Sequence, residues 1–308
     1  MSQAELEHRG YGVRPDKASE PQAYSVWVAR VSSPVAVYAP EITRLRDIPQ
    51  RHFPVGVPLD NSQCASEIMC PRTLNNWNAF EITSAESRIY SVTGRWNVPY
   101  ASASAGLGVN QSDSSATWVG IDGDTNLYPT STDLAQGGTA QVVAYVFFNG
   151  VPSNPLETAY AWTELLPNQK DEAIISNFWI YPGDDVYVSC GVVINMNCSI
   201  SDFTTSSEIN VPTPLGGTTV PGMTAEWVME RPTDTQTNSL DILPNYVQFS
   251  MIDAFASIRN STGGPPISRT FENTPGYNIT MTNTAQQVLS RVADTGSDTM
   301  QFTFVASQ

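Results

Sequence analysis

Histidine and lysine are almost absent from this sequence, and their scarcity excludes several kinds of chemistry. The chain has 308 residues but only two histidines, His8 and His52, which both precede the region richest in apolar runs. A Ser-His-Asp or Cys-His arrangement needs a histidine base, so neither is expected in that later region. With two lysines and a net charge of −15, the chain is also expected to bind neither nucleic acid nor an anionic membrane surface, because phosphate groups would be repelled.

Cysteine is scarce too, and no apolar run approaches the length of a membrane span. The spacing of Cys64 with Cys70 and of Cys190 with Cys198 suggests two local disulfides, with buried free thiols as the alternative. Neither pair has the CxxC spacing of a zinc site, so we expect no metal and no cofactor. The first residues lack the basic and then apolar pattern of a signal peptide. Either a signal has been removed, or the chain is exported otherwise, or it is intracellular.

Residues 1–73 differ from the rest of the chain in proline content and charge. This segment holds eight basic and eight acidic side chains, so the remainder holds 15 − 8 = 7 basic and 30 − 8 = 22 acidic ones. We interpret residues 1–73 as an N-terminal extension and possible pro-region, and 74–308 as one globular domain; a disordered extension is the alternative. Within the extension, residues 24–31 are predicted to form a strand. Its arginines are expected to lie over an acidic cleft at neutral pH and to leave it in acid.

From residue 74 onward the sequence predicts an all-β fold. Short apolar runs alternate with clusters of Gly, Pro, Asn and Ser, which is typical of a sandwich of two antiparallel sheets. Residues 141–148 are apolar on both faces, as in a central strand, and Asn149-Gly150 then predicts a turn. We therefore expect a β-sandwich preceded by an irregular extension.

The stretch 221–230 is the most informative strand in the chain. Because side chains alternate between faces, Glu226, Val228 and Glu230 share one side and Trp227 and Met229 the other. The Trp and Met side is a plausible core face. A carboxylate on the opposite side, beside an aromatic wall, is a candidate for a raised pKa and for acid–base chemistry. A solvated glutamate on an ordinary strand is the alternative.

Six short stretches, in this order along the chain, resemble the glutamic peptidases, or eqolisins. They are Asn76-Trp77, VTGRWNVP at 92–99, TWVGIDGD at 117–124, AQGG at 135–138, AWTE at 161–164 and AEW at 225–227. The resemblance covers about residue 74 to the C-terminus, and AQGG departs from the family's Thr-Gly after the glutamine. It implies a lectin-like (concanavalin-type) β-sandwich and a secreted, acid-acting endopeptidase. Polypeptide substrates and a monomeric state are expected.

The resemblance also implies a set of site residues, with Gln136 and Glu226 in the catalytic roles. One glutamate can act as base towards water and then as acid towards the leaving amine, while a neutral amide positions the water and stabilises the oxyanion. The glycine pair after Gln136 would let the substrate backbone approach closely. Asp122 near Glu226 would raise the pKa of one of the two. The residues matching family positions that line the substrate cleft are Trp118, Asp122, Trp162 and Glu164.

A carbohydrate-directed function is the alternative for the same fold. Two carboxylates, Glu226 with Glu230 or Glu226 with Asp122, could act on either side of a glycosidic bond. A binding protein without catalytic activity could instead use Trp118 and Trp162 as a platform on which sugars or peptides stack.

Overall fold

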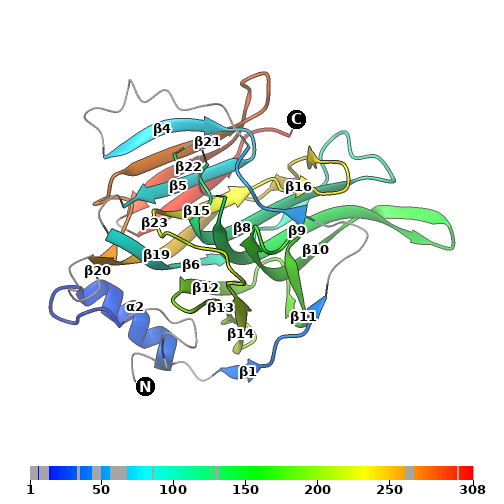
Figure 1. Ribbon diagram of the computed structural model, residues 1–308. Helices are drawn as coiled ribbons and strands as arrows, with labels where there is room; N and C mark the ends of the chain where they lie inside the picture. Colours follow the sequence, from blue (N-terminus) through cyan, green and yellow to red (C-terminus); the bar gives the residue numbers. More distant parts are fainter. Residues whose placement is uncertain are drawn as a thin grey trace.

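The computed structural model describes residue 6 and residues 14–32, 35–43, 50–55, 68–84, 87–125, 127–128, 132–260, 267–296 and 298–307. Most of these residues lie in strands, as the sequence predicts (Figure 1). Within these ranges no helix is long and apolar enough to cross a membrane.

Two layers of mainly antiparallel strands form the molecule. The first layer contains, side by side, β11 (Ala173–Ile180), β10 (Val151–Leu166), β9 (Leu134–Phe148), β8 (Ser112–Asp122), β15 (Thr224–Glu230), β5 (Trp77–Thr83), β21 (Gly276–Thr282) and β4 (Met69–Leu74). The second contains β22 (Val288–Gly296), β23 (Thr299–Phe304), β19 (Phe249–Asn260), β6 (Ser87–Asn97), β12 (Asp185–Val192), β13 (Asn195–Asp202) and β14 (Ser207–Pro214). Because β21 also pairs with β22, the two layers join along one edge.

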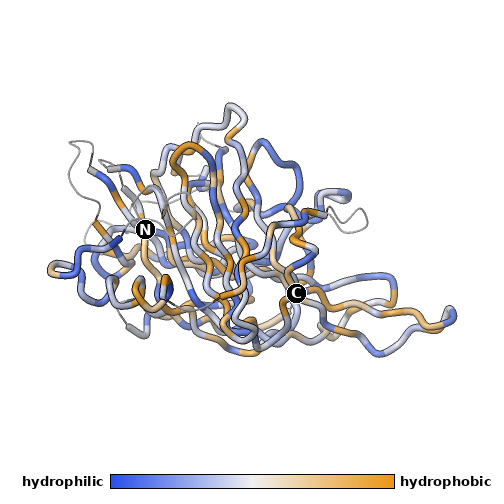
Figure 2. Tube along the Cα trace, turned by 90° about the horizontal axis from the view of Figure 1, so that it is seen from below, coloured by the Kyte–Doolittle hydropathy of each residue, from blue (hydrophilic) through white to orange (hydrophobic). Residues whose placement is uncertain are grey.

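Several short strands complete the fold. At the margins of the two layers lie β1 (Ala36–Tyr38), β2 (Ile42–Thr43) and β20 (Ile267–Arg269). A small three-stranded sheet contains β3 (Gln50–Arg51), β16 (Thr233–Asp234) and β17 (Ser239–Leu240), and a two-stranded one contains β7 (Ala101–Ser102) and β18 (Asn245–Tyr246). The hairpin of β9 and β10 projects well beyond the sandwich (Figures 1 and 2).

The hydrophobic core lies between the two layers and fixes which face of β15 is available for chemistry. Trp227 and Met229 are fully buried in this core, as their alternation predicts. Val228 belongs to a separate apolar cluster on the opposite face of the first layer, together with Trp118 and Trp162. Side chains on that second face, among them Glu226 and Glu230, therefore point away from the main core.

The disulfide between Cys190 and Cys198 joins opposite residues of β12 and β13, which confirms the predicted pair. Cys70 is also disulfide-bonded, whereas Cys64 lies outside the described residues. The predicted glycine pair serves packing rather than close approach of a substrate. A Cβ on Gly137 would lie 3.1 Å from both sulfur atoms of the 190–198 bridge, and one on Gly138 would lie 2.2 Å from the carbonyl oxygen of Thr117.

The described parts of the N-terminal extension lie around the sandwich, and we call residues 14–32, 35–43 and 50–55 the strap. Its helix α2 (Pro21–Ser32) lies on the outer face of the second layer, where Arg30 forms a buried ion pair of 2.7 Å with Glu208. The strap then adds β1 in parallel to the edge strand β14 and β2 to the other layer's edge strand β11. It finally reaches the free face of the first layer, where β3 pairs with β16 (Figure 1).

The strand predicted at residues 24–31 is wrong, because this segment lies within α2. Its alternating valines favour a strand locally, but Ala23 and Arg30, seven residues apart, share the buried face of a helix. Packing against the second layer, with the ion pair to Glu208, has overridden the local β preference.

Candidate active site

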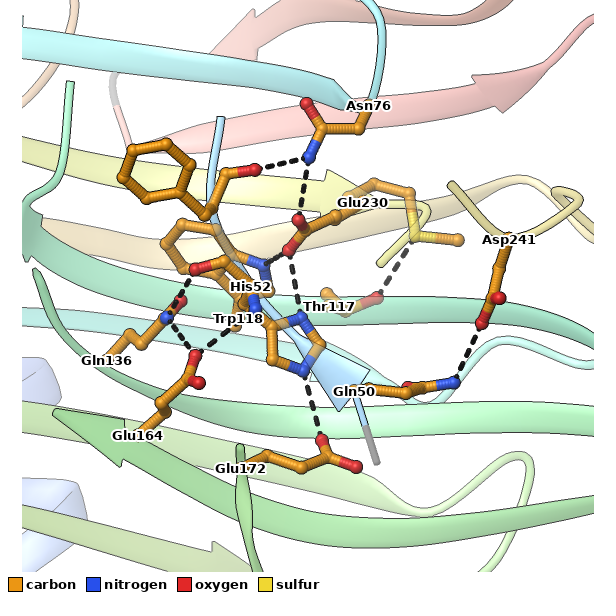
Figure 3. A network of polar contacts seen from close by, with 12 residues as sticks. Gln50, His52, Asn76, Thr117, Trp118, Gln136, Glu164, Glu172, Glu230 and Asp241 are labelled. Atoms are coloured by element: carbon orange, nitrogen blue, oxygen red, sulfur yellow. Dashed lines mark hydrogen bonds and ion pairs between the residues drawn. The ribbon is translucent and has the colours of Figure 1, made fainter. Parts of the chain in front are cut away.

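Polar side chains converge on the free face of the first layer, at the end of β15 next to the strap. Gln136 on β9, Glu164 on β10 and Glu230 on β15 all point to this face and are fully buried. Pairing places Glu164 directly opposite Gln136 on adjacent strands. These three side chains surround His52, which follows β3 of the strap (Figure 3).

The peptide backbone at His52 is bound by two of the predicted site residues. The Nε2 group of Gln136 donates a hydrogen bond of 2.9 Å to the carbonyl oxygen of His52. The backbone N–H of His52 donates to Oε2 of Glu164 at 3.2 Å, and the same oxygen accepts from Gln136 Nε2 at 2.9 Å. The site therefore holds the peptide backbone at His52 by both its N–H and its C=O groups.

Glu230 lies beside this bound peptide and is held by three donors. Its Oε2 accepts from Trp118 Nε1 at 2.8 Å and contacts Nδ1 of His52 at 2.9 Å. Its Oε1 accepts from Asn76 Nδ2 at 2.9 Å (Figure 3). The Asn76 amide donates as well to the carbonyl oxygen of Phe53, so it links Glu230 to the strap.

Burial and neighbouring charges shift the pKa values in this site. Burial alone would lower the pKa of His52, but the charges and hydrogen bonds of Glu230 and Glu172 outweigh it and raise this pKa to about 10. Burial raises the pKa of Glu164 to about 8, against the opposing effect of His52. It raises the pKa of Glu230 too, although His52, Trp118 and Trp77 favour its charged form. The imidazole is therefore a cation that donates from both nitrogens.

Glu226 lies elsewhere on the same face. It pairs across the strands with Glu81 of β5, and burial, with the charge of Glu81, raises its pKa well above the ordinary value. Register places Glu226 and Gln136 on either side of Gly120. The indole of Trp118 fills the space above that glycine, since a Cβ there would lie 2.7 Å from its Cζ3. The expected pair of Gln136 and Glu226 is thus divided by an aromatic ring.

Asp122 holds a turn instead of lining the bound peptide. Its φ is 67°, and its carboxylate accepts from the N–H groups of Gly222 and Met223 at 2.7 and 2.6 Å. These bonds fix the chain as it enters β15. Its charge does contribute to raising the pKa of Glu226, after burial and Glu81, as the sequence led us to expect.

Four of the six predicted site residues thus come together: Gln136, Trp118, Trp162 and Glu164. Sequence reasoning gave no role in this chemistry to His52, Glu172 or Asn76. Glu230 shares the face of Glu226 by the period of two, so the pattern allowed either glutamate at this position. The fold of the strap, which carries His52 into the site, had no comparable sequence signal.

Comparison with known proteins assigns the chain to a family. The sequence model of the peptidase A4 family matches residues 75–304. The chain belongs to this family of glutamic peptidases, the eqolisins. It is therefore a hydrolase of peptide bonds, which decides against the carbohydrate-directed alternative.

Solved eqolisin structures share the fold of this glutamic peptidase. Scytalido-glutamic peptidase with a transition-state analogue inhibitor is 18% identical, with a TM-score of 0.56, and the match covers 75% of this chain and 98% of that one. SCP-B, an eqolisin in complex with the tripeptide Ala-Ile-His, is 18% identical with a TM-score of 0.53 and the same coverage. No curated protein matches the chain.

Proposed function

We propose that this glutamic peptidase is an endopeptidase that uses Glu230 and Gln136, rather than Glu226 and Gln136, for catalysis. The observation that carries the proposal is the bound backbone of His52, whose carbonyl oxygen accepts from Gln136 while Glu230 lies beside it. A substrate bound in the same way would present its scissile carbonyl to the Gln136 amide. The inhibitor and the tripeptide held by the two similar structures are consistent with a peptide ligand.

In the proposed reaction, Glu230 accepts a proton from water as the water attacks the carbonyl carbon, and later donates it to the leaving amine. The N–H of Gln136 stabilises the developing oxyanion, and its carbonyl oxygen is available to orient the water. Burial that raises the pKa of Glu230 suits this double role, because the group must also act as an acid. Trp118 and Asn76 fix its orientation.

Replacing Gln136 tests the oxyanion role. For Gln136→Ala we expect kcat to fall by about 10²–10³-fold, as for loss of one oxyanion-hole donor, with a smaller change in KM. Peptide hydrolysis is measured in mild acid on full chain that has been cut at a specific protease site introduced within residues 56–67. The matched control is Gln141→Ala, five residues further along β9. A Gln136→Ala enzyme that keeps the wild-type kcat would contradict the proposal.

We also propose that the strap is a pro-segment that blocks the site until the chain is cut. It is supported by the position of His52 between Gln136, Glu164 and Glu230, where a substrate residue would lie. The proposed boundary lies within residues 56–67 rather than at 73, because β4 is hydrogen-bonded to β21 in the sheet. Secretion of the monomeric enzyme is part of this proposal, since its disulfide suits an oxidising compartment.

The pKa shifts predict how inhibition by the strap depends on pH. The pKa of His52 is raised to about 10 in the bound strap. Its positive charge therefore stabilises the bound strap fully at pH values below the ordinary pKa of histidine, and this stabilisation is lost as pH rises towards 10. The pKa of Glu164 is raised to about 8. Glu164 therefore takes up a proton when the strap binds, and binding weakens as pH rises above the ordinary pKa of a glutamate. The charged groups that act on His52 are Glu164, Glu172, Glu230 and Asp241.

Both shifts have the same sign, and this opposes the expectation that acid releases the strap. We expect the strap, released by cutting, to inhibit in trans at about pH 5 at least as strongly as at pH 7, and progressively less as pH rises from about 7 towards 10. The measurement is the inhibition constant against a peptide substrate at each pH. Inhibition at pH 7 that disappears at pH 5 would restore the acid-release hypothesis and contradict this one.

A further inference from the structure

The ring of His52 lies in a closed subsite formed by three side chains. It stacks on Trp162 with 3.8 Å between ring centroids and an angle of 13°. Its Nδ1 lies 2.9 Å from Glu230 Oε2, and its Nε2 lies 3.0 Å from Glu172 Oε2. All four side chains are buried, so the ring has exchanged its water entirely for these partners. Figure 3 shows the ring between Glu230 and Glu172.

Glu172 takes no part in the proposed chemistry, yet it is built into this subsite. It immediately precedes β11, and only 2% of it is exposed. Its Oε1 accepts a hydrogen bond of 2.7 Å from the hydroxyl of Tyr160, and its N–H donates to the carbonyl oxygen of Gln50 at 3.0 Å. The bond from Tyr160 of β10 does not depend on the strap, and it holds the other oxygen of Glu172, Oε2, at the outer end of the imidazole.

We propose that Trp162, Glu230 and Glu172 form a substrate subsite that selects histidine, with Glu172 as the specificity-determining residue. The selected residue is the one whose carbonyl oxygen accepts from Gln136, so cleavage follows the histidine. The inference rests on the proposed function, because it assumes that His52 occupies the place that a substrate residue would take. It names the substrate class: peptides with a protonated histidine before the scissile bond.

The chemistry of the subsite distinguishes histidine from other side chains. A flat cation gains from the face of Trp162, and only imidazolium presents two N–H groups at opposite edges of a five-membered ring to two carboxylates. Phenylalanine would fit the stacking position but would leave Oε2 of Glu172 without the donor that His52 supplies. Sites built to hydrogen-bond a substrate group discriminate strongly against analogues that lack it, because the buried partner is left unpaired.

Peptide hydrolysis tests the proposal. The full chain is folded intact and then cut within residues 56–67, and it is assayed at about pH 5, below the ordinary pKa of histidine. The peptides are Ala-Gln-Arg-X-Phe-Ala-Ala with X as His, Phe, Gln or Leu, and mass spectrometry locates the cleaved bond. Any strap that stays bound competes equally with every peptide, so ratios of kcat/KM are unaffected. We expect cleavage after X, with His preferred over Phe by about tenfold or more.

Variants of Glu172 assign this preference to its carboxylate. In Glu172→Gln the ratio of kcat/KM for the His and Phe peptides is expected to fall about tenfold, and in Glu172→Leu the order should reverse in favour of Phe. The matched control is Asp171→Asn, the neighbouring acid, which should keep the wild-type ratio. Thermal unfolding of each variant checks that the fold is retained.

The possible failures can be told apart. Wild-type enzyme that cleaves the whole series without favouring His overturns the subsite alone, as does a preference that survives Glu172→Leu. Failure to cleave any of the peptides, or any denatured protein, overturns the proposed function and this inference with it.

Discussion

Glu230→Gln is expected to reduce peptide hydrolysis by about 10²–10⁴-fold, whereas Glu226→Gln leaves it within a few-fold of the wild type. Both substitutions keep the size of the side chain, and both residues lie on the same face of β15. Glu230 lies against the bound peptide. Burial and the charge of Glu81 raise the pKa of Glu226 well above its ordinary value, which favours the neutral carboxyl, and a neutral amide is a close substitute for that form. The measurement is kcat/KM in mild acid on chain cut within residues 56–67.

The two variants control for each other, because each removes one buried carboxyl from the same strand. Circular dichroism and thermal unfolding should confirm that both proteins fold. An inactive Glu226→Gln enzyme beside an active Glu230→Gln enzyme would return the catalytic role to Glu226, as the sequence resemblance implied. It would also mean that the strap binds beside Glu230, on the same strand as the true catalytic residue but at the other end of it.

His52→Ala in the uncut chain is expected to raise peptidase activity by about tenfold or more. The substitution removes the ring from two carboxylates and from Trp162. Breaking a buried charged pair in this way costs about 3–5 kcal/mol, which corresponds to a change of about 10²–10⁴ in the equilibrium between bound and released strap. The measured gain is smaller than this if the remaining strap contacts keep most molecules closed. Initial rates on a peptide substrate, before any cleavage of the chain itself, give the result.

Val37→Ala is the control for His52→Ala. Val37 belongs to the strap but is 59% exposed on β1, far along the chain from the site. It should leave the uncut chain as inactive as the wild type. If cut chain is active but uncut His52→Ala is not, then the ring is not what blocks the site, and the backbone bonds to Gln136 and Glu164 would have to suffice.

The architecture could be predicted from the sequence because side chains alternate between two faces along every strand. Alternation along β15 predicted that the face carrying Trp227 packs in the core, and turn residues marked where the strands end. Two local disulfides were predicted from spacing alone, and the pair at Cys190 and Cys198 is present. These features depend on neighbours along the chain, which a sequence displays directly.

The centre of the site depended on contacts that a sequence does not display. Glu226 and Glu230 are equivalent by alternation, and only the position of Trp118 over Gly120 separates one of them from Gln136. His52 enters the site from a segment more than 80 residues away from Gln136, and no local pattern near it indicates a ligand. The helix at residues 21–32 was missed for a similar reason, since its buried face is defined by the second layer.

The path of the strap has a consequence for solubility. The outermost strands β14 and β11 each have an open side, and the strap covers part of both: β1 pairs with Ser207 to Ile209, and β2 with Ile174 and Ile175. Once the strap leaves, these backbone N–H and C=O groups face water and become templates for strand addition from another chain. Proteins commonly blunt such edges with charge, and the net charge of −15 provides mutual repulsion between copies at neutral pH. In acid, where carboxylates lose their charge, that repulsion fades while the edges stay open, so the cut enzyme should be more prone to edge-to-edge aggregation than the intact chain.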